Sequence, residues 1–92
     1  MVRLQIAVDH PAADGHFPGN PIIPGAVLLR EIIAAIGDCQ IIRSAKFHHP
    51  VRPGDTLEVS WTVGESREVR FSCAVAGAAR PAVTGVLRLL PS

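Results

Sequence analysis

The segment GHFPGNPIIPG, residues 15–25, places one histidine, three prolines and three glycines in eleven positions. Proline restricts one backbone dihedral angle and glycine tolerates unusual ones, so a segment of this composition predicts a defined, turning loop. A hydrophobic stretch follows it directly. We expect the loop to hold the lone His16 stiffly at the start of an apolar helix. A histidine in such a loop can serve chemistry, or it can only bind the backbone of a turn.

The hydrophobic stretch has the end signals of a helix. Pro24 suits the first helical turn, where its missing N–H costs nothing, and Gly37 suits the left-handed position that closes a helix. The only charged residues between them are Arg30 and Glu31. A helix that is apolar on nearly every side is typically buried, so we expect residues 24–36 to form a buried central helix.

The rest of the chain alternates between apolar and polar residues with the two-residue period of half-buried strands. Turns rich in proline, glycine and serine separate the segments. The expected strands cover residues 2–8, 41–47, 57–63, 69–75 and 82–90. One face of the second strand is expected to carry Ile41, Arg43, Ala45 and Phe47. The pattern predicts an α+β fold in one domain, residues 1–92, with about five mostly antiparallel strands wrapped around the helix.

Composition narrows the classes of function. The chain has 92 residues, 48% of them apolar and 18% charged, which is more apolar surface than a small monomer hides easily, so we expect a homodimer or a larger oligomer. A net charge of +1 argues against nucleic-acid binding. We find no signal peptide and no membrane-length apolar run, and Cys39 and Cys73 form no CxxC motif. These features predict a cytoplasmic protein with reduced, buried cysteines.

Other polar residues give weaker signals. His48 and His49 are adjacent, so on a strand they point to opposite faces and make a poor metal pair. We expect no metal site. Asp14 could orient an imidazole or simply end a turn.

Two motifs, in this order, resemble those of a known family. The sequence HFPGNPIIPG, residues 16–25, resembles the HFPGxPxxPG signature of the FabZ and FabA 3-hydroxyacyl-acyl-carrier-protein dehydratases. The sequence KFHHPVRPGDTL, residues 46–57, resembles the family's KFxxPVxPGDxL segment. Val8 to Pro11, followed by Gly15 and His16, are similar to short dehydratase-like proteins of aryl-polyene and polyketide-type clusters. The resemblance implies the hotdog fold.

The resemblance also implies a site and a substrate. Dehydration removes a proton from C2 of the acyl chain and expels the 3-hydroxyl group as water, and an imidazole is suited to be the base. His16 would be that base, and the backbone N–H of Gly25 would stabilise the enolate. Phe17, Pro18 and Pro24 would lie beside the substrate. The substrate would be an acyl thioester of fatty-acid or polyene-type synthesis, carried on the phosphopantetheine of acyl carrier protein, with no cofactor bound by this chain.

One position departs from the family pattern. The family has a carboxylic acid fourteen residues after the histidine, where this chain has Arg30. A guanidinium group does not release its proton at neutral pH, so Arg30 cannot act as the proton donor, although it could bind a hydroxyl or a carbonyl oxygen of the substrate. Glu31, one residue later, is rotated by about 100° on a helix. The pair could instead form a simple ion pair or two solvated groups.

Three functions therefore remain open on the sequence. The chain could be a dehydratase centred on His16, a hotdog thioesterase that uses Glu31, or a non-catalytic subunit that binds the carrier protein or pairs with an active homologue in a hetero-oligomer. Basic side chains could contact the acidic carrier protein, or they could be ordinary surface. These are Arg3, Arg30, Arg43, Lys46 and Arg52.

Overall fold

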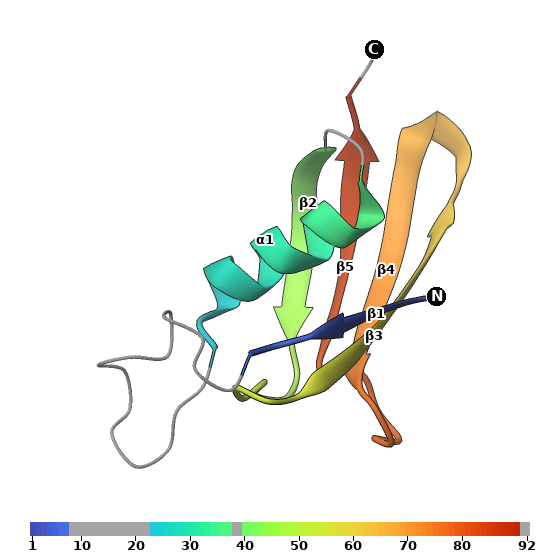
Figure 1. Ribbon diagram of the computed structural model, residues 1–92. Helices are drawn as coiled ribbons and strands as arrows, with labels where there is room; N and C mark the ends of the chain where they lie inside the picture. The colour runs from blue at the N-terminus through green and yellow to red at the C-terminus, as the bar shows by residue number, and fades with distance from the viewer. Residues whose placement is uncertain (8–22, 38–39, 91–92) are drawn as a thin grey trace.

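The computed structural model describes residues 1–7, 23–37 and 40–90. Its elements are β1 (Val2–Gln5), α1 (Gly25–Ile36), β2 (Gln40–Phe47), β3 (Thr56–Val63), the short 3-10 turn η2 (Glu65–Arg67), β4 (Glu68–Val75) and β5 (Val83–Leu89). The strands form one antiparallel sheet in the order β1-β3-β4-β5-β2. Helix α1 lies across one face of this sheet (Figure 1). The α+β architecture predicted from the sequence is confirmed.

Helix α1 begins and ends where its sequence signals predict. Pro24 is the residue before the first helical position, and Gly37 follows the last one with φ of 102°. The Gly37 N–H donates a hydrogen bond of 3.0 Å to the Ile33 carbonyl oxygen. Only glycine reaches this left-handed conformation without strain, so the helix stops there.

The burial of α1 differs from the prediction. Within this single chain only Leu28 and Ile32 are buried on the helix, and Ala26, Arg30 and Ala34 are exposed. These three exposed residues are four positions apart and form one stripe along the helix. A single sheet covers one side of a helix, which leaves the opposite stripe open.

The hydrophobic core lies between α1 and the three central strands. Inward-facing residues of β3, β4 and β5 alternate with polar residues, as the two-residue period predicts. The prediction that Cys73 acts as a small buried apolar residue is confirmed, whereas Cys39 lies outside the described residues. The strand residues with no exposed surface are Leu57, Val59, Val69, Cys73, Val83 and Leu87.

The residues that share one face of strand β2 differ from the prediction. Its pairing with β5 slips between Ile42 and Ser44, which is the mark of a β-bulge. Ile42 pairs with Leu87 and Phe47 with Val83, so both lie on the face that packs toward the helix. The face shared by Ile41, Arg43, Ala45 and Phe47 does not form as predicted, because one extra residue reverses the alternation.

The turn between β2 and β3 fastens the end of β1. The Ile6 N–H donates to the Asp55 carbonyl oxygen at 2.9 Å, and the Gly54 N–H donates to the Ile6 carbonyl oxygen at 2.8 Å. The Arg52 N–H donates to the Asp55 carboxylate at 2.9 Å, which closes the turn. No helix in the part of the chain that the structure describes is long and apolar enough to cross a membrane.

Candidate functional site at the start of helix α1

The first turn of α1 presents unpaired backbone donors. Residues at the start of a helix have no carbonyl group one turn earlier to receive their N–H groups, and here the first intrahelical bond runs from the Leu28 N–H to the Pro24 carbonyl oxygen at 3.0 Å. Within residues 1–7, 23–37 and 40–90 no side chain caps this end, and the first turn contains no acidic residue. As far as the described residues go, the Gly25 N–H can donate to an oxygen atom that carries developing negative charge, and the helix dipole favours that charge.

The structure brings the two sequence motifs together at this helix end. The Ile23 N–H donates a hydrogen bond of 2.7 Å to the Val51 carbonyl oxygen. The Phe47 ring packs against Gly25 so closely that a Cβ atom on Gly25 would lie 2.9 Å from the ring carbon Cζ. Glycine is therefore needed at position 25 for this contact, as well as for access to its N–H.

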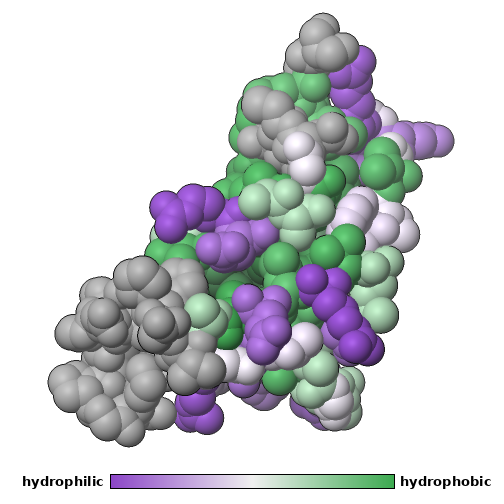
Figure 2. Space-filling view, in the orientation of Figure 1, coloured by the Kyte–Doolittle hydropathy of each residue, from purple (hydrophilic) through white to green (hydrophobic). Residues whose placement is uncertain are grey.

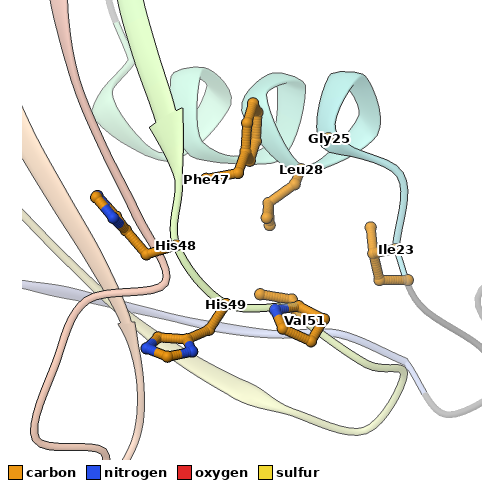
Figure 3. Close-up of a pocket in the computed structure, with 8 residues that line it drawn as sticks. Ile23, Gly25, Leu28, Phe47, His48, His49 and Val51 are labelled. Atoms are coloured by element: carbon orange, nitrogen blue, oxygen red, sulfur yellow. The ribbon is translucent and has the colours of Figure 1, made fainter.

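A pocket of about 380 Å³ opens beside these contacts. Figure 3 shows the Phe47 ring between β2 and the start of α1, with Ile23 and Leu28 on the helix side. The lining is largely apolar, with the two histidines as its ionisable side chains: Ile23, Gly25, Leu28, Phe47, His48, His49, Pro50 and Val51. The pocket thus places hydrophobic side chains beside the first turn of α1.

His48 and His49 follow the end of β2, so they are not on a strand as expected, and both line this pocket (Figure 3). The His48 ring nitrogen Nε2 lies 2.9 Å from the Thr84 hydroxyl oxygen. The N–H groups of both histidines face the Ala82 carbonyl oxygen, at 2.7 Å and 3.3 Å. Among the described residues no group of three or more His, Cys, Asp or Glu side chains could hold a metal ion.

Two of the predicted site residues lie on different sides of α1. Arg30 is exposed on the open stripe, and Glu31 is half-buried on the flank that it shares with Val27 and Ala35. The residue at the family's acid position is thus an arginine that faces away from the sheet of its own chain. The carboxylate of Glu31 does not take over that direction, because one helical residue is a rotation of about 100°.

The predicted site is described in part. Pro24 and Gly25 lie at the helix start, whereas His16, Phe17 and Pro18 lie outside the described residues. Sequence reasoning did not assign Phe47 to the site. The signal was present, because Phe47 belongs to the second motif, but only the fold shows that this motif lies against the first.

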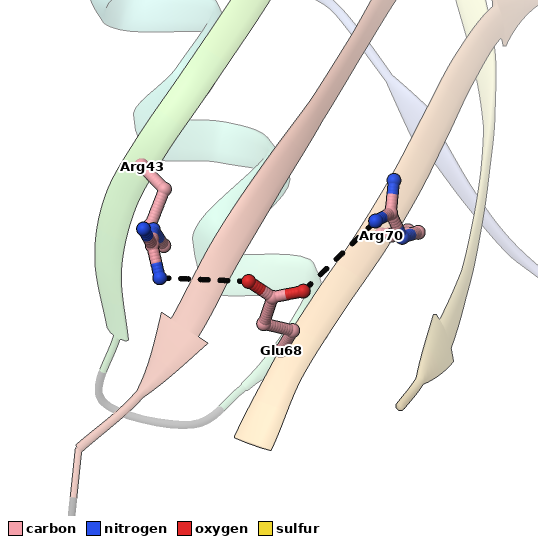
Figure 4. Close-up of polar contacts among 3 residues, drawn as sticks. All are labelled: Arg43, Glu68 and Arg70. Atoms are coloured by element: carbon pink, nitrogen blue, oxygen red, sulfur yellow. Dashed lines mark hydrogen bonds and ion pairs between the residues drawn. The ribbon is translucent and has the colours of Figure 1, made fainter. Parts of the chain in front are cut away.

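Some of the basic side chains form ion pairs within the chain. Arg3 pairs with Glu58 at 3.4 Å. Glu68 lies between two arginines on the sheet face opposite the helix, at 3.5 Å from Arg43 and 4.0 Å from Arg70 (Figure 4). Arg3 and Arg43 thus already pair with carboxylates of their own chain.

Comparisons with known proteins agree with these features. The family model described as ApeI-like, ApeI dehydratase, matches residues 1–85. The 3-hydroxyacyl-acyl-carrier-protein dehydratase FabZ of Latilactobacillus sakei is 32% identical over 83 residues, covering 74% of this chain and 59% of the relative. FabZ of Thermomicrobium roseum is 36% identical over 78 residues, covering 68% and 52%. The chain thus spans a little over half the length of these relatives.

Solved structures show the same fold. The dehydratase heterocomplex ApeI:P from Xenorhabdus doucetiae matches with a TM-score of 0.76 and 24% identity, covering 97% of this chain and 84% of that one. An uncharacterised protein from Erwinia carotovora matches with a TM-score of 0.78 and 28% identity, covering 97% and 80%. The hotdog fold that the motifs implied is confirmed. Because the family model matches residues 1–85 of the 92 residues in this chain, the chain belongs to the ApeI-like dehydratase family.

Proposed function

We propose that this chain takes part in the dehydration of a 3-hydroxyacyl thioester carried by acyl carrier protein, in fatty-acid or polyene-type synthesis. The observation that carries the proposal is the Gly25 N–H, which lies at a helix start that no described side chain caps, beside a largely apolar pocket. This arrangement combines two features that favour an enolate-forming reaction. They are a positioned backbone donor and apolar side chains that limit the access of water. Membership of the ApeI-like family supports the same reaction.

In this proposal His16 accepts the C2 proton of the acyl chain. The negative charge moves onto the thioester oxygen, which receives the hydrogen bond of the Gly25 N–H. The C3–O bond then breaks, and the hydroxyl group leaves as water after it takes up a proton. Arg30 stands where the family has the acid that provides this proton, so the step is expected to be slow unless Glu31 or a second subunit supplies a carboxyl group.

A second copy of the chain is the proposed partner. Strand β2 forms one edge of the sheet over eight residues, and its backbone groups on that side have no strand to pair with among the described residues. Ile41, Ile42 and Phe47 on this strand are each more than 40% exposed. Figure 2 shows further hydrophobic surface on the face that carries α1. A homodimer through β2 would cover this edge and bring two pockets near each other.

A non-catalytic subunit is the second candidate, and the exposed Arg30 favours it. A chain without the acid can still bind an acyl thioester at Gly25 and pair with a homologue that has the acid. The similar protein from Xenorhabdus doucetiae forms a dehydratase heterocomplex, so pairing between different chains has a precedent in this fold.

Turnover assays distinguish these candidates from each other and from a thioesterase. We expect 3-hydroxyoctanoyl carrier protein to lose one water molecule in the presence of the wild-type chain, as measured by intact-protein mass spectrometry. His16→Ala should abolish the loss and leave the circular dichroism spectrum unchanged. Release of the free acid would instead identify a thioesterase. Binding without either reaction would support the non-catalytic subunit.

A further inference from the structure

We propose that Arg80 and His49 form a subsite for the phosphate group of the phosphopantetheine arm that carries the acyl thioester. This inference rests on the proposed function and extends it from the thioester to the arm. Arg80 and His49 line a second hollow of about 560 Å³, together with Phe47, His48 and Pro81. Three of these residues, Phe47, His48 and His49, also line the pocket at Gly25. The two hollows therefore meet around the end of β2.

The charge of the second hollow fits an anion. Among the described residues, its lining contains a guanidinium group and two imidazole rings but no carboxylate, and the described lining of the pocket at Gly25 contains no carboxylate either. Within residues 1–7, 23–37 and 40–90, Arg80 forms no ion pair and the His49 ring forms no hydrogen bond. Arg3 and Arg43, by contrast, are paired with carboxylates of their own chain. Guanidinium groups bind phosphate oxygens through two parallel N–H donors, and this donor set is unused at Arg80.

The backbone holds the subsite in place before any ligand binds. Arg80 belongs to the connection between β4 and β5, and the Ala82 N–H after it donates to the Cys73 carbonyl oxygen at 2.8 Å. The Ala82 carbonyl oxygen receives the N–H groups of His48 and His49. The residues beside Arg80 and the strand end that carries His49 are thus joined directly, so the two side chains share one rigid platform.

The occupant follows from the order of the two hollows. A thioester at the Gly25 N–H puts the acyl chain on the apolar side of the pocket, and the arm on the other side of the sulfur must leave toward solvent. The arm ends in a phosphate ester, and the second hollow, next to the first, offers the guanidinium group of Arg80 and the imidazole N–H of His49 as donors. The lining of the Gly25 pocket would bind the thioester, and Arg80 with His49 would bind the phosphate.

Direct binding tests the subsite without any turnover. Butyryl thioesters lack the 3-hydroxyl group, so they cannot be dehydrated and calorimetry measures binding alone. We expect wild-type protein to bind butyryl-4′-phosphopantetheine at least about 10-fold more tightly than butyryl-pantetheine. This is the difference in affinity that one charge-assisted hydrogen bond to the phosphate supplies. Arg80→Ala should reduce the preference to about 2-fold or less on the same scale, and His49→Ala should reduce it in part.

Arg88→Ala is the matched control. It removes the same charge from an exposed residue near the far end of β5, about 16 Å along the strand from Val83. The control should keep the preference of the wild type. Equal binding of the two thioesters by wild type, or a preference that survives Arg80→Ala, would overturn the subsite. Butyryl-coenzyme A binding more tightly than the phosphopantetheine compound would overturn the carrier arm as its source.

The binding experiment tests the phosphate subsite independently of the proposed dehydration. A phosphate preference in a protein that never dehydrates 3-hydroxyoctanoyl carrier protein supports the subsite and contradicts the enzyme. Dehydration with no phosphate preference supports the enzyme and contradicts the subsite.

Discussion

At the scale of single residues, the site depends on what stands at three positions of one helix. Gly25 lacks a side chain, which lets the Phe47 ring approach the helix start. Arg30 and Glu31 are charged, but they lie on different sides of α1. The chain therefore has glycine at the position of the proposed donor, whereas the residue at the acid position implied by the resemblance has the opposite charge.

Replacing Arg30 tests this interpretation most directly. Loss of a general acid typically lowers a rate by about 10²–10⁴-fold, so Arg30→Glu should raise the rate of dehydration of 3-hydroxyoctanoyl carrier protein by a factor within that range. Arg30→Ala should not raise it, because it removes the cation without supplying a proton donor. A wild-type rate that is typical of enzymes, lowered by Arg30→Glu, would show that Arg30 is a working part of a modified site.

The buried Cys73 makes stability depend on alkaline pH. Burial raises the pKa of the Cys73 thiol from 9.0 to about 11. Between these values the unfolded chain loses the thiol proton and the folded chain keeps it, so the folded state binds more protons. The free energy of unfolding should therefore fall as pH rises through this window, by about 1.4 kcal/mol per pH unit.

Urea denaturation between pH 8.5 and 10.5 measures this effect against the Cys73→Ala variant, whose other titrating groups are the same. The variant should show the shallower decline. Equal slopes in the two proteins would mean that the thiol is not shielded in the folded state.

At the scale of elements, the close approach of neighbouring strands limits which residues fit. A Cβ atom on Gly85 of β5 would lie 2.6 Å from the Phe71 ring carbon Cε1 and 2.6 Å from the Ser44 carbonyl oxygen. Phe71 is 4% exposed, so its ring has little room to move. The bulge in β2 thus requires a strand partner without a side chain.

Gly85→Ala should lower the free energy of unfolding by about 3 kcal/mol, because overpacking of a full core costs about 1–3 kcal/mol and here one of the atoms is backbone. Gly64→Ala is the control, since its nearest neighbour would be the Glu68 carbonyl oxygen at 3.9 Å. Adding Phe71→Leu to the Gly85→Ala variant should recover only part of the lost stability, because the Ser44 carbonyl oxygen still lies close to the new Cβ atom. Similar urea midpoints for Gly85→Ala and Gly64→Ala would contradict this packing.

At the scale of the whole molecule, one copy of the chain leaves apolar surface uncovered. Helix α1 buries Leu28 and Ile32 against the sheet and leaves its opposite stripe open. Strand β2 leaves an eight-residue edge with Ile41 and Ile42 exposed. A long edge strand with exposed apolar side chains offers unpaired backbone groups to a strand of another chain.

Sedimentation should therefore show a dimer at micromolar protein. Ile42→Lys places a charge beside the β2 edge, where Ile42 is 44% exposed, and should shift the protein toward monomer. Val63→Lys makes the same change at a residue that is 61% exposed on β3, away from that edge, and should leave the dimer intact. A wild-type monomer at every concentration, or equal effects of the two variants, would contradict pairing through β2.

The limits of helix α1 follow from sequence alone, because they depend on local steric effects, whereas the first strand ends at Gln5 and is shorter than the predicted 2–8. Pro24 and Gly37 delimit the helix, and the two-residue alternation places the strands and their buried residues. The motifs around Gly25 and Phe47 also predicted the fold and the family.

Only the tertiary structure decided the arrangement between distant segments. The bulge between Ile42 and Ser44 reverses the face of β2, and no local preference encodes it, because it arises from pairing with β5. The contact of Phe47 with Gly25 and the meeting of Arg80 with His49 join residues that are far apart in the chain. Periodicity describes the neighbours of a residue along its own element, whereas contacts between elements depend on strand order and register, which long-range packing selects.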